Sequence, residues 1–150
     1  MISKEFHASR RMRYAELLQD NSMGFVFSGK EKSDKGDQVY PFTPYANFYY
    51  LTGFTQHEAI LMITKMGGKV SETLFIDHPD ERSKRWLGIF YTAESVQEET
   101  GIENVQYLEK FEGSIPLFKG PDRIEHVYVD LASWGVPFYQ SPAQEFAARI

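Results

Sequence analysis

The first candidates for metal ligation and proton transfer in this sequence are its histidines, which are His7, His57, His78 and His126. No two of them form His-Glu-x-x-His or a comparable spacing, which would place two ligands on one face of a helix. The one local cluster of Asp and His is Asp77-His78-Pro79-Asp80. A turn after a strand explains it, because Asp and Pro both favour turns. The residues by themselves therefore indicate no catalytic or metal site.

Composition narrows the class of protein. The chain has 150 residues, of which 42% are hydrophobic and 15% aromatic, as expected of one globular domain. The formal net charge of −5 argues against nucleic acid as a partner, since phosphate binding needs a basic face. Cysteine is absent, which excludes disulfides and thiolate chemistry and fits a cytoplasmic protein. No apolar run approaches the ~20 residues that span a membrane, and the N-terminus shows no signal segment.

Helices and strands alternate along the chain. A helix capped by Ser3 should end near residues 20–22, and Arg10, Arg11 and Arg13 lie mostly off its apolar face, where we expect surface ion pairs. Thr92 and Gly101 should bound a helix over Ala93–Thr100. A helix should also begin at Ser141-Pro142. The expected strands cover residues 24–27, 58–65, 70–77, 105–108 and 125–131, with Gly67-Gly68 as a hairpin turn. This order predicts an α/β domain whose mixed sheet is covered by helices.

Aromatic residues gather in residues 38–54, where seven of seventeen are Tyr or Phe. Pro41 and Pro44 stiffen the entry to this stretch. Residues 47–51 are rich in aromatics and predict a short strand that Thr52-Gly53 ends. Composition alone indicates a core strand entered through a rigid loop.

The order of these residues resembles a known family. Tyr40-Pro41-Phe42, Tyr50-Leu51-Thr52-Gly53-Phe54, Glu58-Ala59-Ile60-Leu61 and Trp86-Leu87-Gly88 are similar to the signature of the aminopeptidase P N-terminal domain. That domain belongs to the Xaa-Pro aminopeptidases of the pita-bread metallopeptidase family, related to prolidase and creatinase. The resemblance runs from about Phe6 to Leu131. It implies a mixed, roughly six-stranded sheet flanked by helices.

The resemblance also implies an activity for the full-length protein. Such enzymes cleave the N-terminal residue that precedes proline in a peptide. Two manganese ions, held by two Asp, a His and two Glu of the C-terminal pita-bread domain, activate a hydroxide for that attack. None of those ligand motifs maps onto this sequence. We therefore expect residues 1–150 to be the N-terminal domain, truncated before the catalytic domain, without a cofactor and inactive by itself.

In that family the N-terminal domain makes subunit contacts in a dimer or tetramer and shapes access to the active site. Trp86 occupies the position of a tryptophan that reaches toward a neighbouring subunit's active site. An ordinary packing role for Trp86 is the alternative. After Gly88 the family's bacterial members carry basic residues, whereas Ile89-Phe90-Tyr91 follow here. These three are either core or an exposed interface patch, and the choice between aminopeptidase and dipeptidase stays open.

A second function belongs to a different class. The same architecture occurs without catalysis in a histone-chaperone relative, whose lobes bind peptides and proteins. A non-enzymatic binding module would use the aromatic stretch or the acidic face for docking. A downstream domain that carries the metal ligands would distinguish the enzyme from the binder.

Overall fold

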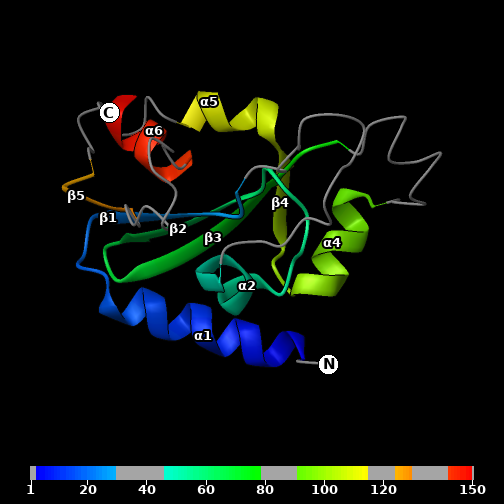
Figure 1. Cartoon of the computed structure of the whole chain (residues 1–150). Helices are drawn as coiled ribbons and strands as arrows, with labels where there is room; N and C mark the ends of the chain where they lie inside the picture. The colour runs from blue at the N-terminus through cyan, green and yellow to red at the C-terminus, as the bar shows by residue number, and fades with distance from the viewer. Residues whose placement is uncertain (1–2, 30–45, 79–90, 115–123, 130–141, 150) are drawn as a thin grey trace.

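The computed structural model describes residues 3–29, 46–78, 91–114, 124–129 and 142–149. One sheet crosses the molecule in the strand order β4-β3-β2-β1-β5, and helices cover both of its faces (Figure 1). Its strands are β1 (Ser22–Phe27), β2 (Ile60–Met66), β3 (Lys69–Ile76), β4 (Asn104–Tyr107) and β5 (His126–Val129). The helices are α1 (Lys4–Leu17), α2 (Ala46–Thr52), α4 (Ala93–Thr100), α5 (Phe111–Ser114), α6 (Pro142–Arg149) and the 3-10 turn η1 (Leu108–Lys110).

The sheet is mixed, as the sequence predicts. β2 and β3 form the expected antiparallel hairpin, in which Gly67 and Gly68 take φ angles of 57° and 77°. Positive φ at both central residues matches the twist of the flanking strands. β1 pairs antiparallel with β2, whereas β5 joins β1 and β4 joins β3 in parallel. The described residues supply five strands, against about six expected.

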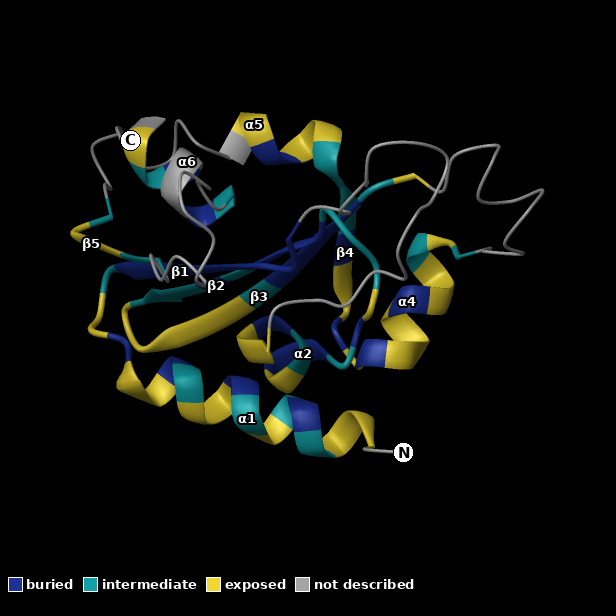
Figure 2. Cartoon of the chain, in the orientation of Figure 1, coloured by how far each residue is buried: buried dark blue, intermediate teal, exposed yellow. Residues whose placement is uncertain are grey.

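Two hydrophobic layers hold the helices to the sheet. On the face that α1, α2 and α4 cover, Phe48, Leu61 and Ile76 belong to the larger core cluster. On the opposite face, Phe146 of α6 and Phe111 of α5 pack in the second cluster. β1 is buried at all six positions because helices lie on both sides of it (Figure 2).

Local signals set the helix ends. The Ser3 hydroxyl accepts the Phe6 amide at the start of α1. Thr92 and Ser95 form a capping box at the start of α4, and Gly101 ends that helix with a φ of 75°. Both starts and the end of α4 confirm the sequence predictions. α1 ends at Leu17, earlier than residues 20–22, because Leu18 is already extended.

The predicted strand over residues 47–51 is wrong, since these residues lie in helix α2. The buried side chains of α2 are Phe48, Leu51 and Thr52, spaced three and four residues apart. That spacing places them on one helical face against the core, and this burial outweighs the strand preference of aromatic residues.

Several predictions fall outside the described residues. They concern the loop before the aromatic stretch and the signature residues Tyr40, Pro41, Phe42, Trp86 and Gly88, together with Ile89 and Phe90. Among the helices that the structure does describe, none combines the length and apolar character needed to cross a bilayer.

Candidate functional site

One described part of the signature, Tyr50-Leu51-Thr52-Gly53-Phe54, forms the last turn of α2 and its cap. The Thr52 hydroxyl donates to the Phe48 carbonyl at 2.9 Å and accepts the Phe54 amide at 3.0 Å. Gly53 has a φ of 69°, and its amide donates to the carbonyl four residues earlier. This left-handed cap satisfies carbonyls that a helix end leaves unpaired. Phe54 then turns into the core, where it is 2% exposed.

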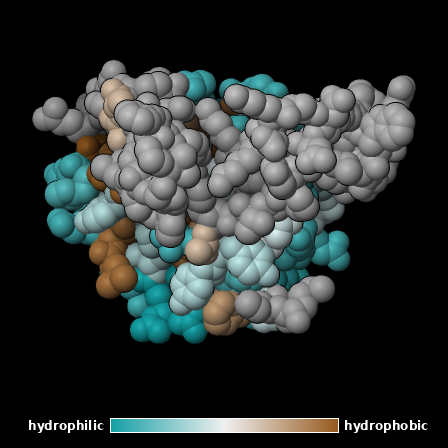
Figure 3. Space-filling model, viewed as in Figure 1, coloured by the Kyte–Doolittle hydropathy of each residue, from teal (hydrophilic) through white to brown (hydrophobic). Residues whose placement is uncertain are grey.

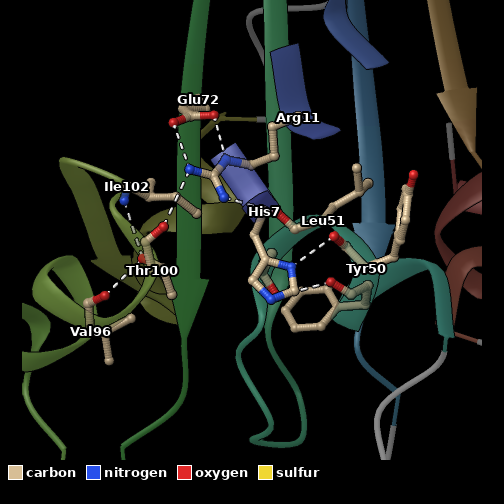
Figure 4. A network of polar contacts seen from close by, with 10 residues as sticks. His7, Arg11, Tyr50, Leu51, Glu72, Val96, Thr100 and Ile102 are labelled. Atoms are coloured by element: carbon tan, nitrogen blue, oxygen red, sulfur yellow. Dashed lines mark hydrogen bonds and ion pairs between the residues drawn. The ribbon is translucent and has the colours of Figure 1, made fainter. Parts of the chain in front are cut away.

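Helix α4 ends with the same device. The Thr100 hydroxyl donates to the Val96 carbonyl at 2.7 Å and accepts the Ile102 amide at 3.2 Å, and Gly101 takes the left-handed conformation between them. Thr-Gly followed by an apolar residue is thus used twice. The two helix ends lie on the same side of the sheet and face the middle of α1 (Figure 4).

Arg11 of α1 joins these two ends. Its Nη1 donates to the Leu51 carbonyl at 2.9 Å, and its Nη2 donates to the Thr100 carbonyl at 3.3 Å. Its Nε lies 2.8 Å from Oε2 of Glu72 on β3, which balances the charge. A cation at two helix C-termini also faces the negative ends of both helix dipoles. The predicted surface pairing is therefore wrong for Arg11, which is 2% exposed.

His7 lies one turn before Arg11 and completes the cap of α2. Its Nδ1 is 2.9 Å from the Tyr50 carbonyl. Because a carbonyl only accepts, Nδ1 carries the hydrogen. The ring packs edge-on against Tyr49 at 5.5 Å and lies over Gly53, where an added Cβ would come within 2.7 Å of it. Gly53 thus serves both the left-handed backbone and the close approach of His7.

Sequence reasoning missed Arg11 and His7 as buried groups, although one signal was present. His7, Arg11 and Ala15 recur every four residues and form the buried face of α1. The arginine was assigned to the surface by residue type, and the histidine was considered only as a metal ligand. Of the signature residues, the structure brings residues 50–54 to this polar network, while Tyr50 itself keeps 47% of its surface exposed.

The polar network of His7 and Arg11 caps the ends of α2 and α4 and packs α1 against them. It presents no obvious reacting group. Within the described ranges, no set of three His, Asp or Glu side chains is arranged to hold a metal. At the Asp77 cluster, the His78 ring stacks on Tyr107 at 4.0 Å, and its Nε2 lies 3.1 Å from Oε1 of Glu109. Asp77 Oδ1 accepts the His78 amide, as in a turn, whereas Pro79 and Asp80 lie outside the described residues. Elsewhere, on α4, Glu99 is exposed on the whole, and partial desolvation of its carboxyl group raises its pKa above the ordinary value.

Comparison with known proteins agrees with this architecture. The family model of the aminopeptidase P N-terminal domain matches residues 7–128. A Xaa-Pro aminopeptidase of Haemophilus influenzae is 27% identical over 147 residues, which are 97% of this chain and 34% of the relative. The Xaa-Pro aminopeptidase of Escherichia coli is 23% identical over 133 residues, 87% of this chain and 30% of that protein. The chain thus spans about a third of the length of these relatives.

Solved structures show the same fold. A Bacillus anthracis protein described as an aminopeptidase P superposes with a TM-score of 0.88 at 31% identity, over 99% of this chain and 35% of that one. Aminopeptidase P of Escherichia coli superposes with a TM-score of 0.78 at 22% identity, over 99% of this chain and 32% of the other. The second likeness concerns the fold alone.

Proposed function

The chain belongs to the aminopeptidase P N-terminal domain family, and from that membership we propose that it is the non-catalytic N-terminal domain of a metal-dependent Xaa-Pro aminopeptidase. The full-length enzyme would remove the N-terminal residue that precedes proline in peptides. The domain would support assembly of the enzyme and access to its active site. The proposal includes a cytoplasmic location.

The observation that supports the non-catalytic role is that the signature residues form hydrogen bonds within the fold. The carbonyls of Tyr50 and Leu51 accept from His7 and Arg11, and the Thr52 hydroxyl is bonded within its own helix end. Groups committed to internal hydrogen bonds in this way fix the positions of helices and are not free to act on a substrate. From the resemblance to the family, we assign the two manganese ions to the catalytic domain of the full-length enzyme.

Trp86 carries the proposed role in substrate access. It lies within the residues that the family model matches. We propose that its indole forms an apolar wall beside the active site of a neighbouring subunit in a dimer or tetramer. A large aromatic surface suits this task because it excludes water and restricts the shape of the peptide.

The test uses the polypeptide that the gene encodes through its natural stop codon, assayed with manganese on a peptide with proline in second position. We expect hydrolysis that a chelator abolishes. Trp86→Ala should raise KM, because the wall is lost, while Trp86→Phe should retain most of the wild-type value. Hydrolysis with an unchanged KM in Trp86→Ala would contradict the role of Trp86. If the gene product hydrolyses nothing, the enzyme proposal fails and a peptide-binding module becomes the better account.

A further inference from the structure

A surface groove lies between α1, the exposed side of α2 and the strands β1 and β5. The proposed peptidase role makes no use of it. Its volume is about 610 Å³. Small-ligand sites in proteins occupy roughly 300–1,000 Å³ and are lined by apolar and aromatic side chains with a few polar groups. The groove meets this description in size, so its lining decides what it could hold.

The lining is mostly aromatic and aliphatic. Three tyrosines, Tyr14, Tyr50 and Tyr128, come from α1, α2 and β5 and border the groove. Leu17, which also lines it, keeps 84% of its surface exposed, and hydrophobic surface is visible near the C-terminal end of α1 (Figure 3). An apolar body laid in the groove would remove such surface from water, which is favourable.

The charged groups of the lining are both cations. Arg10 and Arg13 come from successive turns of α1. The guanidinium of Arg10 lies 4.7 Å from the centre of the Phe6 ring and 5.8 Å from that of Tyr50, within the range of cation–π attraction. Its Nε is buried without a hydrogen-bond partner in the part of the chain that is described. Two guanidinium groups on a chain of net charge −5 make this groove complementary to an anion.

We propose that this groove binds an amphipathic carboxylate, a small molecule with one carboxylate and an unbranched apolar tail. The carboxylate accepts from the guanidinium groups of Arg10 and Arg13, which suit it because a planar fork matches two oxygens. The tail runs along α1 past Tyr14 toward Leu17, which is two helical turns, or about 10 Å, from Arg10. This site is independent of the proposed peptidase role.

Dodecanoate below its critical micelle concentration is the probe, titrated into the chain by calorimetry with binding located by backbone amide chemical shifts. We expect saturable binding at one site, with shifts confined to α1, α2, β1 and β5. Dodecyltrimethylammonium has the same tail and the opposite charge, and it should bind at least about tenfold more weakly, because a charge-assisted hydrogen bond contributes more than a factor of ten.

Variants separate the charge from the apolar surface. Arg10→Met should weaken dodecanoate binding by about tenfold or more, whereas Lys69→Met, at the exposed start of β3, should leave it unchanged. Leu17→Glu, at a position too exposed to affect folding, should weaken binding by repulsion and serves if Arg10→Met does not fold.

Four results would overturn the proposal. One is equal binding of dodecanoate and dodecyltrimethylammonium. Another is unchanged dodecanoate affinity in the Leu17→Glu variant. The third is a set of chemical-shift changes outside the groove. The fourth is self-association of the chain that buries the groove and leaves dodecanoate unbound. None of these results bears on hydrolysis of Xaa-Pro peptides, so failure here is distinguishable from failure of the peptidase proposal.

Discussion

Arg11 in α1 and Glu72 in β3 form an ion pair across 61 residues of sequence, with 2.8 Å between Nε and Oε2. The Arg11 side chain is 1% exposed, and Glu72 retains 30%. The same guanidinium donates to the carbonyls of Leu51 and Thr100. One buried side chain thus ties the first helix to a strand and to the ends of two other helices.

Arg11→Met should lower the free energy of unfolding by about 3–5 kcal/mol, because it leaves a partly buried carboxylate without its partner and two helix ends without a donor. Urea unfolding followed by circular dichroism measures this change. Arg13→Met is the matched control on the exposed side of α1 and should cost less than about 0.5 kcal/mol. Equal stability of the two variants would show that the buried network contributes little.

Gly53 and Gly101 offer a comparison between two helix ends of similar backbone conformation, with φ angles of 69° and 75°. Gly101→Ala should cost about 1–2 kcal/mol through the left-handed conformation alone, since the nearest atom, on Arg11, is 4.0 Å away. Gly53→Ala should cost distinctly more, because the new Cβ would come within 2.7 Å of the His7 ring. Thermal unfolding of both variants provides the test. A Gly53→Ala variant as stable as Gly101→Ala would mean that the ring moves aside freely.

Glu99 predicts a pH dependence. Desolvation by burial raises the pKa of Glu99 above its ordinary value of 4.5, so the folded chain holds this proton to higher pH than the unfolded chain does. Ionisation of Glu99 therefore lowers stability as the pH rises through the interval above 4.5. Glu99→Gln should be more stable than the wild type at pH 7, and the difference should vanish at acidic pH, where Glu99 is neutral in both states. Urea unfolding at a series of pH values measures it, and a constant difference across that series would argue against this origin.

The sequence predicted those structural features that are determined by residues close to them along the chain. The caps of α4 were predictable because Thr92 and Gly101 act on their own helix, and the hairpin was predictable because Gly67 and Gly68 act on their own turn. The signature order also identified the family and the mixed sheet.

The wrong predictions concern features that depend on contacts with residues far away in the sequence. α2 was predicted as a strand because its aromatic residues favour strands, and only the core beneath it selects the helical face of Phe48, Leu51 and Thr52. Arg11 was assigned to the surface because its partners lie 40, 61 and 89 residues away. No local pattern encodes those partners, although the four-residue spacing of His7, Arg11 and Ala15 marked the face that is buried.

The most direct test of the central claim is a turnover measurement on purified residues 1–150 with manganese and a peptide that has proline in second position. The non-catalytic role predicts no release of the N-terminal amino acid above the buffer rate. It also predicts that the chain is folded in that assay, which circular dichroism checks in the same sample. Release that depends on manganese and stops on chelation would contradict the account, because it would place a working metal site within these 150 residues.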